Sequence, residues 1–368
     1  MISRLLTRSF ITCLLLIGSP VHGSDRDESW PEPVGAVELQ SAGGPGLDVG
    51  IVVFDAGIPE DVSTHSKLGV FPSIREAEAR YMPVLLRQAL QDSGAWGVVR
   101  VLPEAQESSE LLVSGRILHS DGLRLAVRIT ARDATGRTWL ERTYFDEAEQ
   151  GDYLVPASGV PREPYADLYR SIANDLLATG GALAQQELAA IRQVGLLRYA
   201  AGLSPEAFGS YLTATPEGRY AALRLPAQGD PMMGRVNRIR NQEYLFVDTV
   251  DEQYLELYET MAPTYFLWRQ YGREQAIYLQ DYQQRAENRS RHGRRGSYAA
   301  MEQTYYTYRS LKIQSQDLVE MAGGFRNEVA PTVMEVSGKV FRLDGTLDSQ
   351  YAEWRDILRQ IFTLETGL

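Results

Sequence analysis

The sequence has 368 residues, and 44% of them are hydrophobic, so it can bury a globular core and is long enough for two domains. Its formal net charge of −11 argues against general nucleic-acid binding and against attraction of the whole protein to anionic membranes. The single cysteine, Cys13, lies in an apolar segment that we expect to be removed. The mature chain is therefore predicted to contain no disulfide, thiolate nucleophile or thiolate metal site.

Residues 1–23 have the pattern of a secretory signal peptide. Arg4 and Arg8 supply the positive region, residues 10–17 supply the apolar core, and Ser24 follows a small-residue cleavage site. Loss of these two arginines, with no acidic residue, changes the net charge from −11 to −13. Residues 24–46 are acidic and rich in proline and glycine, which predicts a flexible leader. We expect export to the periplasm of a Gram-negative bacterium.

Residues 47–148 are predicted to form a small β-α-β-β-β domain. The first strand is an apolar, β-branched run typical of a strand buried on both faces. Asp121-Gly122 predicts a hairpin turn, because both residue types tolerate a positive φ. Arg124, Arg128 and Arg132 alternate with apolar residues, which places them on one face of their strand. The predicted strands span residues 48–55, 96–102, 110–119, 123–132 and 137–144.

A helix is predicted between the first two of these strands. Ser73 and Glu76 match a capping box, and Gly94 is placed to end the helix. Pro83 conflicts with an unbroken helix, because proline lacks a backbone donor and crowds the preceding turn. We therefore expect a kink at Pro83, or a helix that starts near Met82 with the proline in its first turn.

The turns and apolar positions of residues 110–139, including Gly115 and Asp133-Ala-Thr-Gly136, resemble those of small envelope domains. These are the amino-terminal domain of TolB, the periplasmic part of the curli secretion protein CsgG and the lipoprotein LpoB. Residues 81–90 are similar to a helix of ABC-transport auxiliary lipoproteins. The resemblance implies a fold, an envelope location and a role as a non-enzymatic partner in assembly. It carries over no catalytic or binding residue, and the acylated cysteine of those lipoproteins is missing here.

Residues 149–164 are predicted to be a linker, and residues 165–368 a mostly helical, tyrosine-rich domain. Within it, residues 332–343 alternate around Ser337-Gly338, which predicts a late β-hairpin. The predicted class is therefore α+β.

An aromatic stripe follows three- and four-residue steps on one predicted helix, where Pro263 should bend or divide the helix. The pattern favours a helix that packs the stripe into a core, because such stripes are usually buried. Tyrosine also suits half-exposed surfaces, so a partner interface or a stacking platform for glycans stays open. The candidate residues are Tyr254, Tyr258, Tyr265, Trp268 and Tyr271.

A basic segment interrupts the acidic chain at residues 288–296. It contains Arg291, Arg294 and Arg295. The pattern favours a solvated loop between helices. The alternative is contact with lipid headgroups, lipopolysaccharide phosphates or an acidic partner, because arginine binds phosphate with two parallel hydrogen bonds.

The sequence predicts no catalytic residue, cofactor or metal site. The histidines lack metal-ligand spacing, and there is no G-x-S-x-G motif. Asp55, Asp248 and Asp251 are the carboxylates that a glycosidase would use. Two hypotheses remain: a non-enzymatic periplasmic factor that binds or assembles other envelope components, and a protein that binds or hydrolyses glycans.

Overall fold

The computed structural model describes residues 30–41, 43–68, 70–106, 108–154, 162–289, 316 and 331–367. Residues 31–368 form one compact unit. The predicted signal peptide at 1–23 and the basic segment with Arg291, Arg294 and Arg295 lie outside the described residues. The predicted α+β class is confirmed, because a mixed sheet, several helices and a late hairpin are all present.

A five-stranded sheet in the order β2-β1-β3-β4-β5 is the base on which the helices pack. β1 pairs in parallel with β2 and β3, whereas the β3–β4 and β4–β5 pairs are antiparallel. All five strands fall within or beside the five predicted ranges, and the chain order is β-α-α-β-β-β-β; the formula β-α-β-β-β counts one strand too few. The strands are β1 (Val49–Val52), β2 (Val99–Leu102), β3 (Leu111–Ser120), β4 (Arg124–Asp133) and β5 (Thr138–Glu147).

Two helices, α1 (Val62–Leu68) and α2 (Pro72–Ser93), connect β1 to β2. The predicted start of α2 was wrong. Phe71 is the N-cap and Pro72 occupies the first turn, so Ser73 already lies inside the helix. Gly94 ends α2 as predicted, with a left-handed φ of 64° that an L-residue with a side chain rarely adopts.

Pro83 lies inside α2, and the helix does not start near it. Proline has no N–H to donate to the carbonyl four residues earlier, which is that of Ala79. The backbone N–H of Phe54, just after β1, donates to the Ala79 carbonyl at 2.9 Å. The carbonyl that the proline leaves without its helical partner therefore ties α2 to the sheet.

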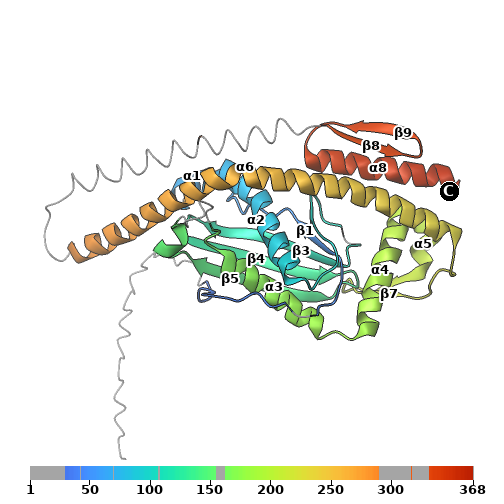
Figure 1. Cartoon of the computed structure of the whole chain (residues 1–368), viewed down its shortest axis with the longest axis horizontal. Coiled ribbons are helices and arrows are strands. Elements are labelled where there is room, and N and C mark those ends of the chain that lie inside the picture. Colours follow the sequence, from blue (N-terminus) through green and yellow to red (C-terminus); the bar gives the residue numbers. More distant parts are fainter. Residues whose placement is uncertain are drawn as a thin grey trace, which may run out of the picture. The chain divides into compact units, whose positions relative to one another are not determined.

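Helices α2 and α3 lie on one side of the sheet (Figure 1). The chain before the sheet packs against it as well. In the predicted leader, Val34 donates its N–H to the Phe145 carbonyl at 3.0 Å, and the Glu38 carbonyl accepts from Asn174 at 2.9 Å. The predicted linker contains a short 3-10 helix with a buried Tyr153. The elements after the sheet are η1 (Gln150–Tyr153), α3 (Ala166–Gly181), α4 (Gln185–Leu203), α5 (Pro205–Phe208), η2 (Gly209–Tyr211), β6 (Leu212–Ala214) and β7 (Tyr220–Ala222).

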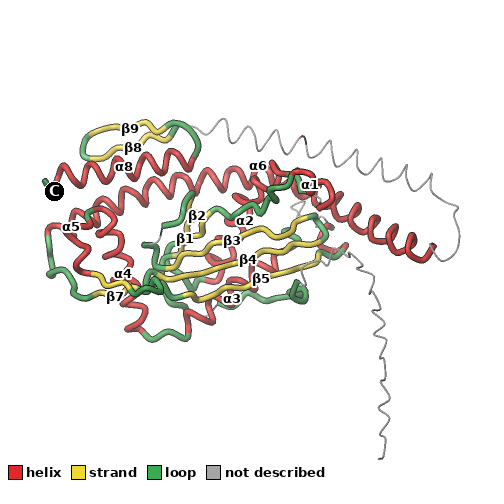
Figure 2. The backbone as a smooth tube through the Cα atoms, turned by 180° about the vertical axis from the view of Figure 1, so that it is seen from behind, coloured by secondary structure: helices red, strands yellow, loops and turns green. Residues whose placement is uncertain are grey.

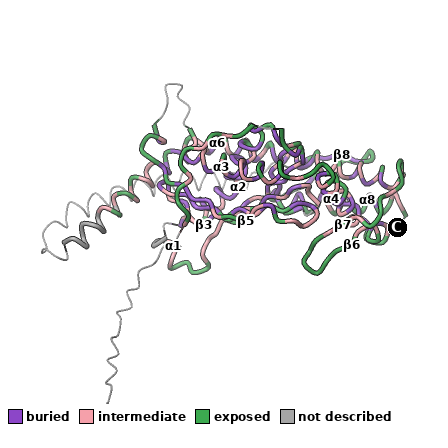
Figure 3. The backbone as a smooth tube through the Cα atoms, turned by 90° about the horizontal axis from the view of Figure 1, so that it is seen from below, coloured by how far each residue is buried: buried purple, intermediate pink, exposed green. Residues whose placement is uncertain are grey.

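Helix α6 (Pro231–Arg289) joins two hydrophobic cores. With 59 residues it is about 90 Å long at about 1.5 Å per residue, and Pro263 does not divide it. Its later part packs Leu257 and Phe266 into the core beneath the sheet. Its earlier part belongs to a second core with α8 (Leu347–Thr366). Buried residues are concentrated where these helices and the sheet meet (Figure 3).

The late hairpin is confirmed at β8 (Thr332–Val336) and β9 (Lys339–Leu343). Its turn residues, Ser337 and Gly338, have φ values of 53° and 74°, as the tight turn requires. The hairpin forms a sheet of its own and does not extend the larger one. Phe341 packs edge-on against Trp354 of α8, with the ring centroids 6.1 Å apart. This packing supports a pair of strands that would be marginal alone.

Candidate functional site

The predicted aromatic stripe lies mainly in the core. Tyr254, Tyr265 and Trp268 expose only 1%, 2% and 3% of their surface. Tyr258 and Tyr271 are partly buried and pack against the core that contains Tyr265 and Trp268. A stacking platform or partner interface needs accessible rings, so Tyr254, Tyr265 and Trp268 are core residues, as the stripe pattern favoured, and not an interaction surface.

Buried charges hold this part of α6 in place, and the sequence pattern did not reveal them. Glu78 of α2 accepts hydrogen bonds from Tyr265 at 2.5 Å and from Ser120 at 2.7 Å, and Arg75 lies 3.4 Å from its other oxygen. Burying a carboxylate requires such donors, because the desolvation penalty is otherwise too large. These groups are closed off from solvent and therefore stabilise the packing of the helix.

A second buried pair links α6 to the segment before α3. Arg269 donates to both oxygens of Glu163, at 2.6 and 2.8 Å, and its guanidinium lies 4.4 Å from the centroid of the Tyr265 ring. This bidentate geometry is the strong form of an arginine–carboxylate contact.

The three carboxylates considered for glycoside chemistry each have a different arginine partner. Asp248 pairs with Arg100 of β2, and Asp251 pairs with Arg87 of α2 while accepting the Val101 N–H at 3.1 Å. Burial raises the pKa of Asp251, and the Arg87 guanidinium opposes that shift. These contacts fasten α6 to the sheet and to α2.

Asp55 lies apart from that pair, after β1, and is 3.5 Å from Arg116. Each of the three carboxylates is thus held by an arginine of its own. Within the described residues, no group of three or more histidine, cysteine, aspartate or glutamate side chains could hold a metal ion.

One face of the sheet has no helix over its centre (Figure 2). We call this region the open face. Its side chains form rows across β3, β4 and β5, because the register places Ser114, Thr130 and Glu141 side by side. The row on one side of these residues contains Arg116, Arg128 and Thr143, and Arg132 of β4 lies in the row on their other side. The open face comprises Ser114, Arg116, Arg128, Thr130, Arg132, Glu141 and Thr143.

The open face concentrates positive charge. Arg116 and Arg128 lie directly opposite each other on neighbouring strands, an arrangement that disfavours the sheet because like charges face one another. Asp55 offsets Arg116 only weakly, because each side chain of this pair is 58% exposed. Arg128 and Arg132 are exposed and form no ion pair with any residue that the structure describes.

Beside the open face, β5 is an edge strand of ten residues. Among the described residues outside the sheet, Val34 makes a backbone hydrogen bond to β5, because its N–H donates to the Phe145 carbonyl. The opposite edge differs, because β2 has four residues and Asp251 of α6 accepts from it. An edge strand can accept another strand where its outer backbone groups are free, and at Phe145 that position is already taken by Val34.

Among the described residues, no helix is long and apolar enough to span a membrane. Comparison of the sequence with protein-family models and with curated proteins finds no match to either.

Proposed function

We propose that this protein is an exported, non-enzymatic binding factor of the bacterial envelope, and that its open face binds an acidic partner protein. The observation that carries the proposal is the cluster of three exposed arginines on a sheet face without a covering helix, in a chain with a net charge of −11. A basic patch on an acidic protein favours a negatively charged partner by electrostatic complementarity.

The energetic argument concerns Arg116 and Arg128. Two cations placed opposite each other on adjacent strands destabilise the isolated protein, so a carboxylate brought between them relieves repulsion as well as making new hydrogen bonds. Arg132, four residues along β4 from Arg128, extends the positive charge by roughly 13 Å. A partner with several acidic residues in an extended segment matches this spacing.

The edge of β5 supports the same class of partner. An extended segment that adds a strand to β5 gains main-chain hydrogen bonds, while its side chains alternate between the two faces of the sheet. Acidic side chains on the open-face side would then lie near the arginine rows. The surfaces of the protein perform the proposed function, and no reacting group is required.

The test is co-purification from envelope extracts with a variant that reverses two charges, Arg128→Glu with Arg132→Glu. Both side chains are exposed, so folding should survive, and circular dichroism checks it. We expect the acidic partner to bind at least about tenfold more weakly, because like charges then face each other across the interface. Binding by the wild-type protein should also weaken as salt is raised.

The matched control is Arg342→Glu on β9, an exposed arginine outside the open face. It should retain the partner. The proposal is wrong if the double variant captures the same partner with the same affinity. It is also wrong if the bound material is anionic lipid or lipopolysaccharide and not protein.

A further inference from the structure

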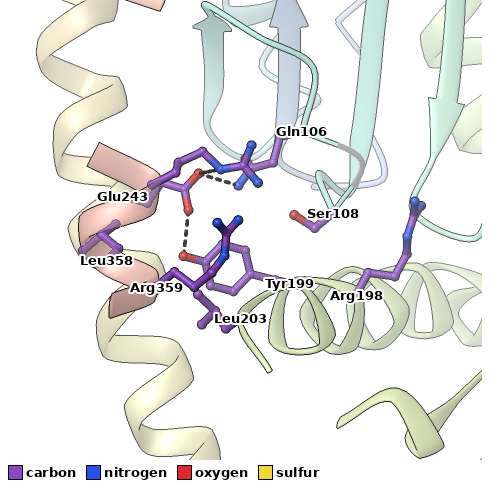
Figure 4. Close-up of a pocket in the computed structure, with 10 residues that line it drawn as sticks. Gln106, Ser108, Arg198, Tyr199, Leu203, Glu243, Leu358 and Arg359 are labelled. Atoms are coloured by element: carbon purple, nitrogen blue, oxygen red, sulfur yellow. Dashed lines mark hydrogen bonds and ion pairs between the residues drawn. The ribbon is translucent and has the colours of Figure 1, made fainter. Parts of the chain in front are cut away.

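A polar cavity of about 200 Å³ lies away from the open face, where four segments of the chain meet. The loop between β2 and β3 contributes Gln106 and Ser108, α4 contributes Tyr199, α6 contributes Glu243, and α8 contributes Arg359. Figure 4 shows the Arg359 guanidinium and the Ser108 hydroxyl directed toward the same space, beside the Tyr199 ring.

The Glu243 carboxylate is part of the wall and is already satisfied. It is 2% exposed and accepts hydrogen bonds from Tyr199 at 2.7 Å, Tyr351 at 2.8 Å and Gln106 at 3.0 Å. Burial first, and then the Glu243 charge, raise the pKa of Tyr199 and Tyr351 far above the usual range, so both hydroxyls remain donors. This carboxylate therefore organises the donors around it and does not need a cation from a ligand.

Three guanidinium groups line the cavity, and Glu243 is the carboxylate among the lining residues that the structure describes. Arg355 and Arg359 are one turn apart on α8, a like-charge spacing that destabilises a helix. Arg355 lines the cavity, and its Nε lies 3.4 Å from Glu243. Arg359 donates one bond to Asp356 at 2.7 Å, an exposed ion pair of small energetic weight.

The third guanidinium, that of Arg198, is held at the rim. It donates to the Ala134 carbonyl at 2.9 Å and lies 4.1 Å from the centroid of the Tyr220 ring. Its orientation is thus fixed before any ligand arrives, and preorganised donors lose little entropy on binding.

We infer that this cavity is a binding site for a phosphate group, held by Arg355, Arg359 and the Ser108 hydroxyl. The positive charge selects an anion, and forked guanidinium donors match the several acceptor oxygens of phosphate. A volume of about 200 Å³ corresponds to roughly six water molecules at about 30 Å³ each. It accommodates a phosphate ion or the phosphomonoester end of a small molecule, and is smaller than the sites of about 300 Å³ and more that hold drug-sized ligands.

The experiment is calorimetric titration of the full mature chain with inorganic phosphate and, separately, with glycerol 3-phosphate, in chloride buffer at constant ionic strength. We expect saturable binding of one phosphate group per chain. Arg359→Gln should weaken it about tenfold or more, because a charge-assisted hydrogen bond is lost while Glu243 keeps its donors. The ligand of higher affinity identifies the source, a free ion or a phosphomonoester.

Arg342→Gln is the control, since it removes one exposed guanidinium that does not line the cavity. It should bind phosphate as the wild type does, and thermal unfolding checks that both variants are folded. Absence of saturable binding by the wild type would overturn the site, and so would equal affinity of Arg359→Gln and the wild type. The variant with Arg128→Glu and Arg132→Glu on the open face should bind phosphate as the wild type does. Failure of the phosphate site is therefore distinguishable from failure of the proposed partner binding.

Discussion

Buried carboxylates in this protein differ in how their charge is compensated. Glu243 and Glu78 each receive hydrogen bonds from two or more side chains. Asp146 at the end of β5 is 7% exposed, and its side chain accepts a hydrogen bond from the Glu147 N–H at 3.0 Å. Burial, followed by the nearby negative charge of Asp167, raises the pKa of Asp146 to about 6.

Asp146→Asn should therefore stabilise the protein at pH 7. A carboxyl whose pKa is higher in the folded chain binds more protons there, so its contribution to stability falls as pH rises from about 4 to about 6. Asparagine removes that cost while its oxygen still accepts from Glu147. We expect a gain of about 1–2 kcal/mol at pH 7 that shrinks toward zero at pH 4, measured by urea unfolding.

Glu353→Gln, on an exposed turn of α8, controls for the change in net charge. It should alter the free energy of unfolding by less than about 0.5 kcal/mol at either pH. An Asp146→Asn variant that is equally stable to the wild type at pH 7, or stabilised by the same amount at pH 4, would contradict this interpretation.

At the scale of elements, local patterns predicted the strands and the end of α2 but missed the start of that helix. Alternation and the left-handed glycines at 122 and 136 located β4 and its turns, because both signals act within a few residues. Pro83 and Pro263 did not break their helices, since burial of the surrounding side chains outweighs the local cost.

The candidate sites depend on contacts that no spacing in the sequence encodes. The period-two pattern correctly placed Arg128 and Arg132 on one side of their strand, but their position beside Arg116 depends on the pairing of β3 with β4. The cavity is harder still to foresee. Gln106, Glu243 and Arg359 come from segments more than a hundred residues apart and meet through tertiary packing alone.

The clearest energetic prediction at the scale of elements concerns the packing of α8 into the second core. Trp354 is fully buried, donates its N–H to the Gln242 carbonyl at 3.3 Å, and stacks near Phe246 with the ring centroids 6.4 Å apart. Trp354→Ala leaves a large cavity, so we expect a loss of about 3–5 kcal/mol in the free energy of unfolding. Urea denaturation measures it, and hydrogen exchange should show lost protection across α8.

The companion substitution is Val340→Ala on β9, a side chain that is 68% exposed. It should change stability by less than about 0.5 kcal/mol. A cost below about 1 kcal/mol for Trp354→Ala would mean that α8 contributes little to the second core.

At the scale of the whole molecule, the described part of this acidic chain gathers arginines on the open face and in the cavity. The open face uses β3 and β4, and the cavity uses α4 and α8. Helix α6 reaches both cores and carries Glu243, so it couples the packing around the two regions without supplying arginines to either site. This separation allows the proposed partner and the phosphate group to be tested one at a time.

The central claim is that the open face binds an acidic envelope protein. It is most directly tested by photo-crosslinking in growing cells, with a photoreactive amino acid in place of Thr130, between Arg128 and Arg132 on β4. The account predicts a crosslink to an acidic envelope protein, formed by a chain that begins at Ser24 in the periplasmic fraction. The crosslink should disappear when both arginines are reversed, and should not form from position 353. Crosslinks of equal yield from both positions, adducts with lipid alone, or an uncleaved chain in the cytosol would contradict it.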